Sequence, residues 1–97
     1  MIRHLVLFKL NEGVGRDEPR VVAAAEAFAA LGPVIPELKS WQCGWNITVR
    51  DIAYDYAIAC DVEDTDALAR YLSHPDHQAA AARWREFATW VIADLES

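Results

Sequence analysis

Two histidines and a tyrosine lie within the short stretch from Tyr71 to His77. A neutral imidazole can accept a proton and a phenol can donate one, so Tyr71 and His77 could act as an acid/base pair. His77 would act as a general base, a role that typically contributes about 10²–10⁴-fold to a rate. Tyr71 would donate a hydrogen bond to the oxygen that gains charge. In the alternative interpretation, His77 binds backbone and Tyr71 is a packing aromatic, and the residue types leave both open.

Pro75 divides this stretch and predicts how it folds. Proline has a fixed φ and no N–H, so it suits the first position of a helix and disfavours the interior. One helix should therefore end before Pro75 and another begin there, with Ser73 or His74 just outside. His77 then lies in the first turn, where free N–H groups and the helix dipole oppose imidazolium formation. We expect His77 to be neutral and His74 to cap the corner.

His4 is the third candidate, and it lies on a predicted strand over residues 2–10. Alternation places His4 on one face with Val6 and Phe8. A lone histidine on an apolar face is more often a satisfied structural group than a ligand. Convergence of His4 with Tyr71 and His77 beside one apolar cavity would nevertheless form a catalytic site.

The histidines and cysteines do not predict a metal centre. The three histidines lack HxH or HExxH spacing, so neither a metal nor another cofactor is expected. Cys43 and Cys60 are too few for a disulfide framework, and both fall in strand-like runs where buried free thiols are expected.

Length and composition limit the kinds of partner that are expected. A chain of 97 residues corresponds to one domain, 1–97. Nine Lys and Arg against fifteen Asp and Glu give a net charge of −6, without a basic cluster. Nucleic acid and anionic membrane are therefore not expected partners. We find neither an N-terminal leader pattern nor an apolar run of membrane-spanning length, so a cytoplasmic location is expected.

Hydrophobic periodicity predicts seven elements in the order β-α-β-β-α-α-β. Strands are expected over about 2–10, 38–49, 54–62 and 90–95, and helices over about 17–31, 64–72 and 76–88. Asp17 and Asp64 are plausible N-caps, and Gly44 could mark a bulge. This order fits a ferredoxin-like α+β sandwich, a four-stranded antiparallel sheet with all helices on one face.

The other face of that sheet has no cover within the chain. Leu5, Leu7, Ala57 and Ala59 would make it apolar, and hydrophobic residues form 54% of the sequence. Monomers seldom expose apolar patches larger than a few hundred Å². We therefore expect two copies to pack sheet to sheet as a C2 homodimer.

Several stretches resemble, in their order, the stress-responsive A/B barrel domain (Dabb) proteins. They are Ile2-Arg3-His4-Leu5-Val6-Leu7-Phe8, Trp45-Asn46, Tyr54-Asp55-Tyr56, the stretch from Tyr71 to His77, and Ala93-Asp94. The resemblance covers nearly the whole chain and implies a dimeric α+β barrel. The family is functionally mixed and includes stress-induced proteins without established chemistry. One branch resembles olivetolic acid cyclase, which closes poly-β-keto thioesters by aldol condensation without a cofactor. That resemblance assigns its acid/base pair to Tyr71 and His77, and a further histidine to His4.

Three functions follow as alternatives. The first is a homodimer with a pocket for a small apolar or aromatic ligand. The second is a cofactor-independent polyketide cyclase-like enzyme that uses His77, Tyr71 and His4. The third is a cofactorless monooxygenase, by analogy of fold alone, and the His-Pro-x-His corner disfavours it.

Overall fold

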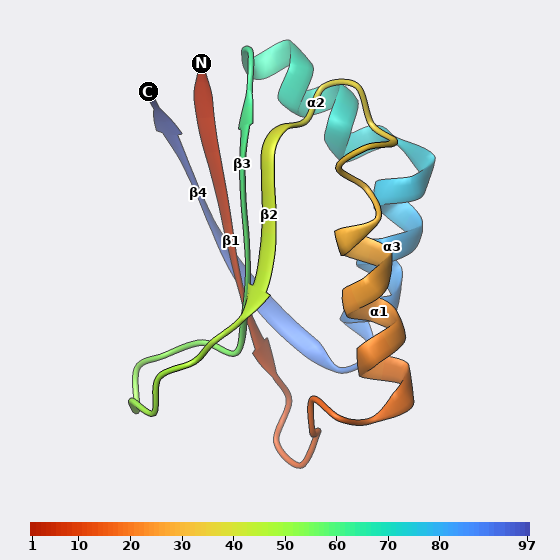
Figure 1. Cartoon of the computed structure of the whole chain (residues 1–97), viewed down its shortest axis with the longest axis vertical. Coiled ribbons are helices and arrows are strands. Elements are labelled where there is room, and N and C mark those ends of the chain that lie inside the picture. The colour runs from red at the N-terminus through yellow and green to blue at the C-terminus, as the bar shows by residue number, and fades with distance from the viewer.

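The computed structural model describes all residues, 1–97, and confirms the predicted element order (Figure 1). The elements are β1 (Ile2–Leu10), α1 (Pro19–Ala29), β2 (Lys39–Trp45), β3 (Tyr56–Val62), α2 (Thr65–Ser73), α3 (Pro75–Arg85) and β4 (Ala88–Glu96). The four strands form one antiparallel sheet in the order β2-β3-β1-β4, and the three helices cover one face of it. The fold is therefore the predicted ferredoxin-like α+β sandwich. No helix is both long and apolar enough to cross a membrane.

The alternation of β1 separates its covered side from its open side. His4, Val6 and Phe8 are buried toward the helices, whereas Leu7 on the opposite side is 43% exposed. Strand β3 repeats the pattern, since Tyr56, Ile58, Cys60 and Val62 are all buried. The helices complete this core with small residues that allow close approach and with large aromatic ones, among them Trp84, which is fully buried.

The corner between α2 and α3 forms as Pro75 predicts. Helix α2 begins at its cap Asp64, whose carboxylate accepts a hydrogen bond from the Ala67 N–H at 2.8 Å. It ends at Ser73, and His74 is the N-cap of α3, with Nδ1 accepting from the Asp76 N–H at 3.1 Å. Because both helix ends are satisfied locally, the direction of α3 is fixed relative to α2.

Several predicted boundaries were wrong by a few residues. The N-cap position of α1 is held by Glu18 instead of Asp17, without a side-chain hydrogen bond to the helix, because Pro19 occupies the first helical position. Strand β2 ends at Trp45 because the Asn46 side chain bonds Thr48 and turns the chain out of the sheet. The β2 irregularity lies between Lys39 and Gln42, where Ser40 has a φ of +52°, and not at Gly44.

The open face of the sheet is apolar. Leu5, Leu7, Ala57, Ala59, Val91 and Ala93 surround a shallow apolar depression on it. Leu7 and Val91 are direct cross-strand partners and are 43% and 48% exposed. This is the surface that the sequence predicts to be covered by a second copy.

Candidate functional site

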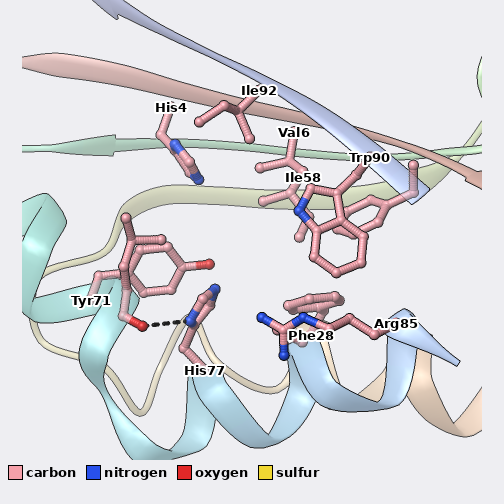
Figure 2. A pocket seen from close by; sticks show the side chains of 12 residues that line it. His4, Val6, Phe28, Ile58, Tyr71, His77, Arg85, Trp90 and Ile92 are labelled. Carbon is pink, nitrogen blue, oxygen red and sulfur yellow. Dashed lines mark hydrogen bonds between the residues drawn. The ribbon is translucent and has the colours of Figure 1, made fainter. Parts of the chain in front are cut away.

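A cavity of about 180 Å³ lies between the sheet and the helices (Figure 2). Its wall combines β1, β3 and β4 with α2, α3 and Phe28 of α1, so every element except β2 contributes to it. Nine of the twelve lining residues are hydrophobic. The three candidates from the sequence, His4, Tyr71 and His77, all line this one cavity. The remaining strongly polar group is Arg85.

His77 lies in the first turn of α3, at the position that Pro75 fixes. Its Nδ1 is 2.9 Å from the Leu72 carbonyl oxygen. A carbonyl can only accept, so Nδ1 carries the proton and Nε2 has the free lone pair. Figure 2 shows this second nitrogen pointing into the cavity. Burial lowers the pKa of His77 below its ordinary value, and the positive charge of Arg85 acts in the same direction, whereas the hydrogen bond to the Leu72 carbonyl opposes it.

Tyr71 comes from the last turns of α2 and is 1% exposed. Figure 2 shows its hydroxyl pointing into the cavity, and it has no hydrogen-bond partner in the protein. Burial raises its pKa well above the ordinary value, and the Cys60 and Cys43 thiols add to this. The phenol therefore stays protonated and can donate. Its ring packs edge-on against His77, with centroids 4.6 Å apart.

His4 faces the same cavity from β1 and is 2% exposed. Its Nδ1 lies 2.5 Å from Oδ1 of Asp94, its cross-strand partner on β4. A carboxylate can only accept, so Nδ1 of His4 donates to Asp94, and Nε2 is the ring nitrogen that has no partner in the protein. Sequence reasoning missed this role for Asp94. The available signal was a carboxylate within the apolar run of β4, at the register position opposite His4.

The other titratable candidates stay outside this arrangement. His74 caps α3 and does not line the cavity. Burial raises the pKa of Cys43 to about 11 and that of Cys60 to about 12, so both are protonated thiols. No group of three or more His, Cys, Asp or Glu side chains is arranged to hold a metal ion.

The site combines the imidazole acceptor of His77 and the phenol donor of Tyr71 with the ring of His4 in a mainly apolar space. Such a set can take a proton from a bound molecule and hydrogen-bond an oxygen of it without a metal. Trp90 and Arg85 also line the space, and neither was predicted as a site residue.

The chain is similar to known proteins along its whole length. The model of the stress responsive A/B barrel domain family matches residues 2–97. An uncharacterized protein of Streptomyces coelicolor is 70% identical over 96 residues, which cover 99% of both chains.

Two solved structures extend the comparison to the fold and to its assembly. A dimeric ferredoxin-like protein of unknown function from Thermobifida fusca is 32% identical, with a TM-score of 0.86 over 99% of this chain and 90% of that one. A dimeric protein of unknown function from Bacteroides fragilis, also ferredoxin-like, is 27% identical, with a TM-score of 0.85 over 99% and 95%. The chain belongs to the stress responsive A/B barrel domain family.

Proposed function

We propose that the protein is a homodimer in which each protomer binds one small, mainly apolar ligand in the cavity between sheet and helices. The observation that carries this proposal is the unpartnered Tyr71 hydroxyl at the wall of a mainly hydrophobic space of about 180 Å³. An apolar cavity of about 150 Å³ accommodates benzene. A ligand with one ring, or a short chain of similar volume, therefore suits this cavity, and an oxygen on it would meet the hydroxyl.

The homodimer is supported by two independent observations. Similar solved structures are dimeric. The face of the sheet opposite the helices carries a contiguous set of exposed apolar side chains, including Leu7 and Val91. Sheet-to-sheet packing about a two-fold axis would remove this surface from water.

Ligand binding is tested by NMR titration with phenol, whose ring and hydroxyl match the proposed occupant. Phenol should shift the side-chain resonances of Trp90 and His77, which line the cavity. Ala81→Leu places a larger side chain in the cavity and should abolish these shifts. Ala79→Leu adds the same atoms on the exposed side of the same helix and should preserve them. Equal shifts in both folded variants would contradict the proposal.

The second candidate is cofactor-independent proton transfer of the cyclase type. It is favoured by the free Nε2 of His77 beside a protonated Tyr71. Nε2 would take a proton from the carbon between two carbonyls, and the electron pair would move onto a carbonyl oxygen held by the Tyr71 hydroxyl. The resulting enolate carbon would attack a second carbonyl to form a C–C bond. The new alkoxide would then recover the proton from His77, so acid and base are regenerated. His4, oriented by Asp94, would hydrogen-bond the same substrate.

This second candidate is tested by the exchange of α-protons for deuterium in ethyl 2-methylacetoacetate, followed by NMR against the buffer rate. His77→Gln should reduce protein-catalysed exchange by about 10²-fold or more, the range of a general base. His74→Asn is the matched control, since His74 lies off the cavity and asparagine also caps helices. Exchange that survives in His77→Gln would contradict the assignment.

A further inference from the structure

Arg85 is a cation without a counter-ion at the cavity wall. It is the last residue of α3, and Figure 2 shows its guanidinium turned toward the cavity, on the same side as His77. The protein's ion pairs use Arg3, Arg20, Arg70 and His4, so Arg85 has no carboxylate partner. Its guanidinium carbon lies 5.8 Å from the centre of the Trp90 ring, which steadies it over an apolar surface.

The cavity holds nothing that neutralises this charge. None of its twelve lining residues is an aspartate or glutamate. Asp94, which lies behind His4 on β4, is already hydrogen-bonded to that histidine. Arg85 is itself exposed, so its guanidinium lies at the edge of the cavity, where it can meet both solvent and a ligand. Arg83 and Arg85 both lie in the last turn of α3, where the helix dipole favours cations, but only Arg85 lines the cavity.

The spacing of residues along α3 places the unpaired guanidinium of Arg85 on the same side of the helix as His77. His77, Ala81 and Arg85 follow at intervals of four residues, so they share one face of the helix, and all three line the cavity. The small side chain of Ala81 leaves space between the imidazole and the guanidinium. Helical side chains lean toward the N-terminus, which directs Arg85 back toward His77.

We propose that Arg85 binds a carboxylate of the ligand, so that the ligand class is small aromatic or short-chain carboxylic acids. The apolar part would occupy the space over Ala81, and the far end would meet His77 and Tyr71. A guanidinium fork matches a carboxylate in two parallel hydrogen bonds. One cation balances one negative charge, which favours a monoanion over a phosphate. This inference rests on the proposed ligand cavity and adds the substrate class to it.

Two probes of nearly the same shape test it, phenylacetate and neutral 2-phenylethanol, each titrated into the full-length protein by NMR. The native protein should bind phenylacetate about tenfold more tightly, as expected for a charge-assisted hydrogen bond at a partly exposed site. Arg85→Met keeps an apolar stem against Trp90 and should abolish this preference without weakening 2-phenylethanol. Arg83→Met removes the same charge from the same turn and should preserve the preference.

The outcomes separate the two proposals. Equal affinities of the native protein for both probes would overturn the role of Arg85 while leaving the cavity intact as a binding site. An equal loss of preference in Arg83→Met would also overturn it, because the effect would then be long-range charge. If neither probe binds at millimolar concentration, the ligand cavity itself fails and the carboxylate assignment fails with it.

Discussion

Replacing Leu7 and Val91 together by serine should weaken the proposed homodimer by a calculable amount. The two side chains face each other across β1 and β4 on the open face of the sheet, and they are 43% and 48% exposed in the single chain. Because neither contributes to the helix-side core, the substitution acts mainly on what the open face contacts. The double variant should remain folded, but its dimer should have a higher Kd than the native dimer.

The magnitude follows from the exposed fractions. Complete burial of a leucine contributes about 2 kcal/mol and of a valine about 1.5 kcal/mol. The exposed 43% and 48% therefore leave about 0.9 and about 0.7 kcal/mol to be gained at an interface. A two-fold interface contains each side chain twice, so the total is about 3 kcal/mol. This corresponds to a Kd increase of roughly 200-fold.

Sedimentation velocity over a concentration series measures that change. Val22→Ser is the matched control, because Val22 is 42% exposed but lies on α1, on the other side of the molecule. It should leave the dimer Kd unchanged. A native protein that is monomeric at micromolar concentration would refute the reasoning. An equal increase of Kd in the double variant and in Val22→Ser would also refute it.

Three further predictions concern the single chain. Gly32→Ala should destabilise the fold by about 1–3 kcal/mol in urea unfolding, because its Cβ would lie 2.7 Å from Cδ1 of Trp41, whereas Gly15→Ala, with open space around it, should not. The lowered folded-state pKa of His77 means that the unfolded chain takes up a proton more readily, so stability should fall as pH drops below about 6.5, and His77→Gln should flatten this fall. Tyr71→Phe should change the free energy of unfolding in urea by no more than about 0.5 kcal/mol, because the Tyr71 hydroxyl has no hydrogen-bond partner in the protein. A larger loss of stability would show that the hydroxyl does have such a partner.

The fold was predictable because its signals are local and agree with one another. Alternation in β1 placed His4, Val6 and Phe8 on the covered face, and Pro75 predicted the start of α3 to within one residue. The predicted boundaries were wrong where a side-chain hydrogen bond, and not the hydrophobic pattern, ends an element. The Asn46 amide ends β2 through bonds to Thr48, and no hydrophobic pattern contains that information.

The candidate site was predictable only in part. His4, Tyr71 and His77 were expected to converge, and they line one cavity. Asp94 was missed because its role depends on the β1–β4 register, which pairs residues 90 positions apart. Arg85 was missed because its importance lies in lacking a partner, and only the arrangement of all neighbouring carboxylates reveals this. The prediction that His77 is neutral agrees with its lowered pKa, although burial is the main cause instead of the helix terminus.

The pairing of β1 with β4 also sets when this site can exist during folding. His4 and Asp94 meet only after the chain has closed a loop of about ninety residues, the least local event in the fold. Contacts of such separation form slowly, whereas the α2–α3 corner with Tyr71 and His77 is assembled from neighbours. A partly folded molecule can thus carry the tyrosine and the base in place while the opposite wall is missing. Ligand binding by the pocket would then show that β1 and β4 have paired, and not merely that the helices have folded.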